Sequence, residues 1–160
     1  MELWDLLTKI RDRLKDDADI KAWCQANYSS DHTLYISYDE RNPPPDDDFP
    51  ILVISAVEQN RSLGEDYGPM MIEIGYGVYD DTKTTSGNVV TYAGLQNILG
   101  FRETVETVLF ALNPDSDLGG AWIEGAHELI EPVEAFPVFI SNVLYTFRNP
   151  DRFSTLLVQT

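Results

Sequence analysis

The sequence lacks most of the residues from which a catalytic or metal site is usually built. Its single cysteine, Cys24, excludes a disulfide within the chain, and we interpret it, beside Trp23, as a small packed hydrophobe. Neither histidine, His32 or His127, has a second histidine or cysteine at the spacing of zinc ligands. The chain also has no Gly-x-Ser-x-Gly elbow, no P-loop and no Gly-x-Gly-x-x-Gly fingerprint. We therefore expect no catalytic residue, no metal site and no cofactor.

Long apolar runs and basic residues are also scarce. No apolar run approaches the roughly 20 residues of a membrane span, so we expect no membrane partner. The charged residues 1–17 do not resemble a signal peptide. The 27 acids and 11 bases give a net charge of −16, and five of the bases lie in residues 1–21. Such a surface repels the phosphate backbone, so it would not wrap DNA but suits the lining of a passage for DNA.

The spacing of apolar residues predicts an α+β fold. Residues 3–14 have helical spacing, and Asp16 or Asp17 can cap a second short helix. Residues 58–68 are polar and are expected to form a loop, and residues 80–88 are expected to form a loop or the tip of a hairpin. A long helix is predicted over 89–112, ended by Asn113-Pro114, and strands over 32–38, 51–57, 69–79, 120–130 and 137–147. We therefore predict an antiparallel or mixed sheet of about four to five strands, packed by an N-terminal helix pair and one long helix. Residues 1–150 form one predicted domain, and 151–160 a C-terminal tail.

Two predicted strands differ in the way their apolar residues are arranged. In 69–79 the apolar residues alternate, and Gly75 and Gly77 fall on the outward face, where they leave room for a close approach. The strand 137–147 is apolar on both faces, so a second subunit is a candidate for the second cover. We expect a subunit interface on one of these faces, formed by Phe139, Val143, Tyr145 and Phe147. On this interpretation Val143→Asp would give monomers that still fold.

The stretch RNPPPDDDFP, residues 41–50, places three prolines before three carboxylates. With Asp39 and Glu40, the aspartates Asp46, Asp47 and Asp48 form an acidic loop. Calcium loops space their ligands and usually place a glycine at the turn, and this loop does neither. Three adjacent like charges also resist burial together. We therefore favour a solvated loop, stiffened by proline, over a ligand cage, and we keep the metal site as an alternative.

The order of elements and several short stretches resemble a known family. A helix pair is followed by a strand, a Pro/Asp-rich loop, "FPILVIS", "PMMIEIGYGVY", a long helix and "EPVEAFPVFISNVLYTFRNP". This order resembles that of the tail terminator and minor tail proteins, or head–tail joining proteins, of long-tailed bacteriophages and prophages. An N-terminal helix, an "fP.i.i" strand after a proline-containing loop and a late "f…v…l.y.f" strand recur in that family.

The resemblance implies a structural role in the virion and no enzymatic activity. Proteins of this family form a ring, commonly a hexamer, which stops polymerisation of the tail tube and meets the head connector. The implied partners are therefore other copies of the chain, the tail-tube protein and head-connector proteins, with assembly in the bacterial host cytoplasm. In such a ring the acidic loop is expected to face the lumen or a neighbouring part, and DNA would pass without specific binding.

Two other functions remain open at this point. One is a small acidic metal-binding or hydrolytic enzyme that uses the loop 39–48 together with His32. The other is an acidic inhibitor that mimics DNA, although the acids cluster in loops rather than along one helix face.

Overall fold

A computed structural model describes residues 1–37, 41–59, 69–129 and 136–148. It contains three helices, a mixed five-stranded sheet and a separate two-stranded sheet, which confirms the predicted α+β class. In chain order the elements are α1 (Leu3–Leu14), α2 (Ala18–Tyr28), β1 (Thr33–Ile36), the short 3₁₀ helix η1 (Asp46–Asp48), β2 (Ile51–Gln59), β3 (Met70–Tyr79), β4 (Lys83–Ser86), β5 (Val89–Tyr92), α3 (Ala93–Phe110), β6 (Trp122–Leu129) and β7 (Val138–Arg148).

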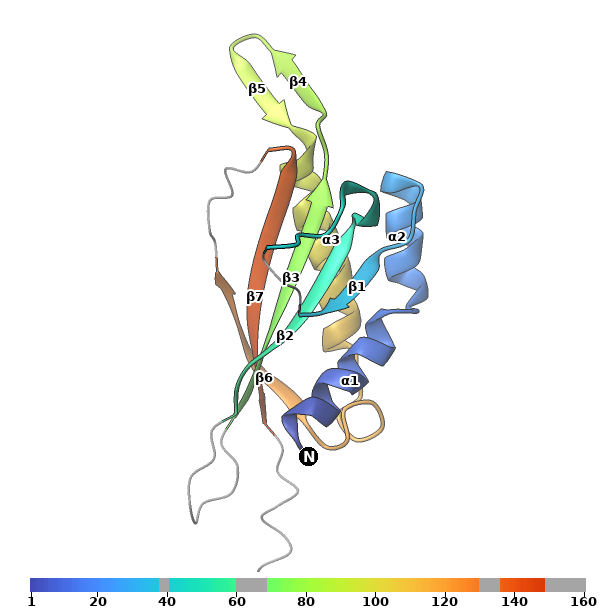
Figure 1. The fold of residues 1–160 in the computed structure, drawn as a ribbon, viewed down its shortest axis with the longest axis vertical. Helices are drawn as coiled ribbons and strands as arrows, with labels where there is room; N and C mark the ends of the chain where they lie inside the picture. The colour runs from blue at the N-terminus through green and yellow to red at the C-terminus, as the bar shows by residue number, and fades with distance from the viewer. Residues whose placement is uncertain (38–40, 60–68, 130–135, 149–160) are drawn as a thin grey trace, which may run out of the picture.

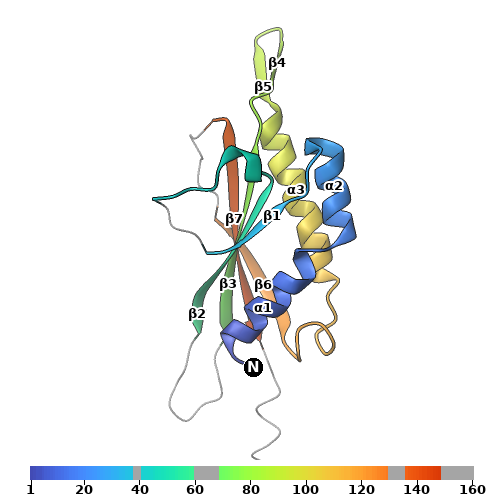
Figure 2. The same ribbon diagram turned by 45° about the vertical axis from the view of Figure 1, so that its right-hand side comes forward.

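The main sheet has the strand order β1-β2-β3-β7-β6, and only the β1–β2 pair is parallel. All three described helices lie on one side of this sheet (Figures 1 and 2). We call the opposite side the open face. Because parallel neighbours cannot be joined by a tight turn, the chain between β1 and β2 makes a long excursion. The described part of that connection, 41–49, crosses the open face.

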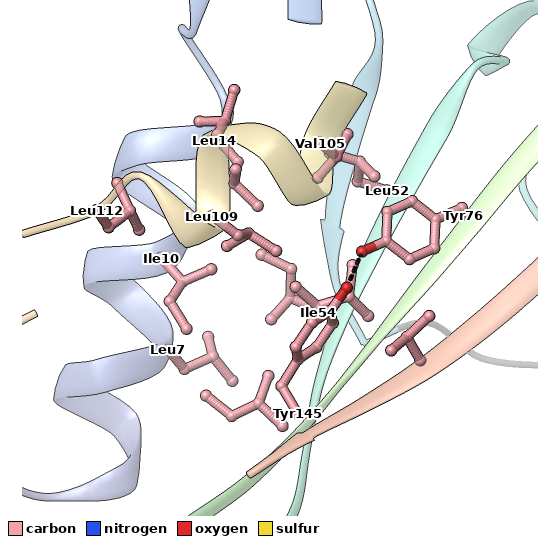
Figure 3. Close-up of a cluster of buried hydrophobic side chains, with 14 of the residues drawn as sticks. Leu7, Ile10, Leu14, Leu52, Ile54, Tyr76, Val105, Leu109, Leu112 and Tyr145 are labelled. Carbon is pink, nitrogen blue, oxygen red and sulfur yellow. Dashed lines mark hydrogen bonds between the residues drawn. The ribbon is translucent and has the colours of Figure 1, made fainter. Parts of the chain in front are cut away.

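The core lies between the helices and the sheet. Five alternating β3 side chains, at Met70, Ile72, Ile74, Tyr76 and Val78, are buried, as their spacing predicted. Figure 3 shows the helical side of this core, where α1 and α3 place their leucine, isoleucine and valine side chains against the sheet. Residues buried from the two helices are Leu6, Leu7, Ile10 and Leu14 of α1, and Ile98, Phe101, Val105, Val108 and Leu109 of α3.

Local signals explain where α2 begins and ends. The side chain of Asp17 accepts hydrogen bonds from the backbone N–H groups of Asp19 (3.0 Å) and Ile20 (3.2 Å), so Asp17 is the cap residue. Ser29 ends the helix in the left-handed conformation, with φ of 56°. Between these two ends, α2 buries Ile20 and Cys24 in the core.

The region 80–92 differs from the prediction. The segment 80–88, expected as a loop or a hairpin tip, joins the start of the expected helix in a hairpin, β4–β5, and α3 begins at Ala93 rather than at residue 89. Gly87 turns the hairpin with φ of +61°, a conformation that glycine adopts without steric cost. All eight strand residues of the hairpin are exposed. Because neither face is buried, their sequence shows no regular spacing of apolar residues from which strands could be predicted.

Candidate assembly surfaces and the acidic loop

Three of the four side chains assigned to a subunit interface lie inside a single protomer. Val143, Tyr145 and Phe147 are at most 2% exposed, in the core between the β-sheet and the helices. The interface prediction is therefore wrong for these three residues. Helices of the same chain cover the face of β7 on which they lie. Val143→Asp would now bury a carboxylate, so it is expected to prevent folding rather than to release folded monomers.

The fourth predicted interface residue, Phe139, is partly buried against its own helix. A Cβ atom added to Gly94 of α3 would collide with the Phe139 ring, so the helix passes too close to the ring for any residue but glycine at this position. Phe139 also meets Phe136, with ring centroids 6.4 Å apart. The contact of Phe139 therefore fixes the first turn of α3 above the start of β7.

The outward glycines of β3 are also approached by the chain itself. A Cβ atom at Gly77 would lie 2.7 Å from Cγ1 of Ile51 and 3.1 Å from Cε1 of Phe49. A Cβ atom at Gly75 would lie 2.9 Å from Oδ1 of Asn142. The close approach that these glycines permit is therefore made on the open face by β2, by Phe49 just ahead of β2 and by β7.

The described part of the acidic loop lies on the open face, and its three aspartates differ in how exposed they are to solvent. Asp46 and Asp47 are exposed, whereas Asp48 is half-buried and accepts a hydrogen bond from the Tyr35 hydroxyl of β1. This bond to a carboxylate raises the pKa of Tyr35. The Phe49 ring lies 6.4 Å from the Tyr79 ring, which fastens the end of the loop to β3.

The loop residues Asp39 and Glu40 lie outside the described residues. Within the described ranges, no group of three His, Cys, Asp or Glu side chains is placed to hold a metal ion. The described loop therefore presents two solvated carboxylates and one that is tied to the sheet.

His32 and Cys24 belong to the packing of α1, α2 and β1. Nε2 of His32 lies 3.0 Å from the Leu14 carbonyl oxygen, so this nitrogen carries the proton and donates it. Burial lowers the pKa of His32, since the charged imidazolium would lose its hydration. Burial also raises the pKa of Cys24 to about 12, which keeps its thiol protonated. These properties describe packed side chains rather than a nucleophile and its base.

A chain of hydroxyl groups, not anticipated from the sequence, crosses the core. The Tyr145 hydroxyl donates to Oε1 of Glu106 at 2.9 Å and lies 2.7 Å from the Tyr76 hydroxyl (Figure 3). Because a hydroxyl has one proton, Tyr76 donates to Tyr145, which donates to Glu106. Burial raises the pKa of both tyrosines, so both stay protonated. A buried tyrosine hydroxyl needs a hydrogen-bond partner. The apolar pattern of the two strands did not show which residues would supply these partners.

The same region of α3 is joined to the edge of the sheet by Arg102. Its guanidinium pairs with Glu128 of β6, donates to the Ser141 hydroxyl of β7 at 3.3 Å and lies 3.9 Å from Glu106. These contacts connect the long helix to the two strands β6 and β7. We assign the network to positioning α3 over the sheet, because its tyrosines remain protonated and its acids are paired.

Five of the eleven exposed large apolar side chains among the described residues lie on or beside the projecting hairpin, whereas others, such as Trp4 (61%) and Phe110 (55%), lie elsewhere. Figure 1 shows β4–β5 extending beyond the main body, with α3 starting directly at its base. The Tyr92 ring meets the Phe136 ring at a centroid distance of 5.2 Å. We call the following set the arm surface: Val89 (57% exposed), Val90 (51%), Tyr92 (42%), Leu95 (59%) and Phe136 (51%).

The arm surface also lies in the least acidic part of the chain. The sequence has 27 acids in 160 residues, yet the 21 residues 82–102 contain none. The bases within that stretch are Lys83 and Arg102. The arm is therefore a nearly uncharged, apolar projection on a strongly negative body.

No protein-family model matches this chain, and no curated protein sequence matches it. Among the helices in the described ranges, none has the length and apolar character that would let it cross a lipid bilayer.

Proposed function

We propose that this protein is a structural component of a long-tailed phage or prophage virion, a tail terminator that forms a ring at the junction of tail and head. Its partners are other copies of the chain, hexameric by analogy with the family it resembles, together with the tail-tube and head-connector proteins. The ring assembles in the cytoplasm of the bacterial host and becomes part of the virion. DNA passes through it without specific binding.

The observation that carries this proposal is the nearly uncharged, apolar arm on a chain whose net charge is −16. An isolated two-stranded hairpin is marginally stable in water, and clustered exposed apolar side chains usually mark an interaction site. An arm of this kind therefore supports a role in assembly. The negative body supports a role near passing DNA, because acidic side chains repel phosphates and would not slow their movement.

The acidic loop supports the same function in a limited way. Asp46 and Asp47 are exposed on the open face, and the contacts of Asp48 and Phe49 hold the loop against the sheet. A fixed loop with free carboxylates can contribute negative potential to a ring lumen. A metal-binding or hydrolytic role has less support, because His32 is buried and bonded to the Leu14 carbonyl.

The test is light scattering coupled to size-exclusion chromatography over a wide range of protein concentrations, with negative-stain images of the largest species. We expect a closed ring with a central hole, and no change in melting temperature on adding EDTA, calcium or zinc. A strict monomer at every concentration would overturn the proposal, and stabilisation of that monomer by one of these metals would favour the metal-binding alternative.

A further inference from the structure

We propose that the arm surface receives the C-terminal segment, residues 149–160, of a neighbouring copy of this chain. This inference rests on the proposed function, since it supplies the contact that would join one protomer of a ring to the next.

The composition of the segment matches the arm surface. Its sequence, NPDRFSTLLVQT, contains four large apolar residues, Phe153, Leu156, Leu157 and Val158. Its charged residues are Asp151 and Arg152, so no acid follows residue 151. Two copies of charge −16 repel each other, and this repulsion is weakest where both contact surfaces are uncharged. Apolar burial would then contribute about 25 cal/mol for each Å² removed from water.

The segment leaves the sheet at the end opposite the arm. Val138 pairs with Tyr79, just before the hairpin, whereas Phe147 pairs with Met70 at the other end of β3. The 11 residues of β7 span about 33 Å at a strand rise of about 3.3 Å per residue. The segment therefore begins one sheet length away from the base of its own arm.

Of the apolar residues in the segment, only Val158 can reach the base of its own arm, and only when the chain is fully extended. Even fully extended, Phe153 lies within about 17 Å of Arg148 and Val158 within about 35 Å. The arm begins about 33 Å away and extends further beyond the body, as Figure 1 shows. A neighbouring protomer has no such limit. Because the arm of one copy contacts the C-terminal segment of the next, the contact is head-to-tail and can repeat from copy to copy. Such a contact closes into a ring if the rotation between successive copies divides a full turn evenly.

The hairpin also offers backbone groups for such a contact. Within the described residues, β4 and β5 pair only with each other, so each strand has a free edge. An extended peptide can add to a free strand edge while its side chains fill apolar positions. Val90 and Tyr92 share one face of the hairpin, which gives that edge an apolar side.

The test uses full-length variants and sedimentation velocity. The arm variant is Val90→Asp, and its matched control is Val57→Asp, because both valines lie in strands and are 51% exposed. The tail variant is Leu156→Asp with Leu157→Asp. We expect the wild type and the control to assemble, and the arm and tail variants to lose assembly while keeping the wild-type circular dichroism spectrum.

Mixing the two defective variants identifies the contact itself. The arm variant retains an intact tail, and the tail variant retains an intact arm. An equimolar mixture is therefore expected to form a species of two chains and nothing larger. An unlabelled synthetic peptide of residues 149–160 is expected to dissociate wild-type assemblies, whereas a scrambled peptide leaves them intact.

The outcomes separate this inference from the proposed function. If the wild type forms rings and the arm or tail variant forms them equally well, the inference is overturned and the ring remains. The inference is also overturned if the mixture of variants stays monomeric. If the wild type never assembles at any concentration, both proposals are overturned.

Discussion

The helix-covered face of the sheet and the arm are built in opposite ways. On the covered face, Tyr76, Phe101 and Tyr145 are at most 1% exposed and contact residues that are distant in sequence. On the arm, Val90 and Tyr92 are 51% and 42% exposed, and their described strand partners are within the hairpin. The difference implies that folding stability resides in the body, whereas association resides in the arm. Substitutions should therefore separate the two properties.

The largest expected effect on stability is at the centre of the covered face. The Phe101 ring is stacked on Trp23 at 5.2 Å and meets the edge of Tyr76 at 6.3 Å. Phe101→Ala is expected to lower the free energy of unfolding by about 3–5 kcal/mol, since it leaves a cavity. Val90→Ala on the arm should change it by less than about 0.5 kcal/mol. Urea denaturation measures both, and equal losses would mean that the arm is part of the folding unit.

A smaller effect is expected from the hydroxyl chain beneath α3. Tyr145→Phe removes the middle group and leaves both Tyr76 and Glu106 without the partner described above. We expect a loss of about 1–3 kcal/mol in the free energy of unfolding, because buried polar groups are left unsatisfied. Tyr76→Phe removes only the first donor, so its loss should be smaller. The reverse order in the same denaturation experiment would contradict the assigned direction of the hydrogen bonds.

The smallest expected effect concerns pH. Burial lowers the pKa of His32 below its ordinary value of 6.5, so the unfolded chain binds a proton that the folded chain does not. The contribution of His32 to stability is therefore lost as pH falls through 6.5 toward its folded pKa. His32→Gln should flatten the fall in unfolding free energy between about pH 7 and pH 5. A fall of the same steepness in His32→Gln would contradict this assignment.

The sequence predicted those parts of the fold that bury a face. Strand β3 and helix α1 were found from their apolar spacing, because the core imposes a period of two on a strand and 3.6 on a helix. A hairpin tip was one alternative for residues 80–88, but the second strand of the hairpin was missed for the opposite reason, since no core lies against it. Val89 and Val90 were consequently assigned to the helix that follows, although Ser86-Gly87-Asn88 contained the turn signal.

The candidate surfaces were predicted less well than the fold. The apolar pattern correctly identified β7 as a strand with two apolar faces, but a pattern does not reveal what covers each face. For Val143 and Tyr145 the cover is the protein's own helical layer. The hydroxyl pair Tyr76–Tyr145 joins positions 69 residues apart, a pairing that only the register of β3 and β7 determines. The arm surface follows from topology, since Tyr92 and Phe136 meet only in the folded chain.

The position of β7 has a consequence for the time course of synthesis. β7 lies between β3 and β6, yet it is translated after every other described strand. Val138 pairs with Tyr79, which leaves the ribosome 59 residues earlier. At a translation rate of about 5–20 residues per second, Val138 is synthesised about 3–12 s after Tyr79. The edge of β3 that pairs with β7 therefore stays unpaired for at least that time. During that interval, a nascent chain exposes an apolar strand edge on which a chaperone, or a second nascent chain, can act.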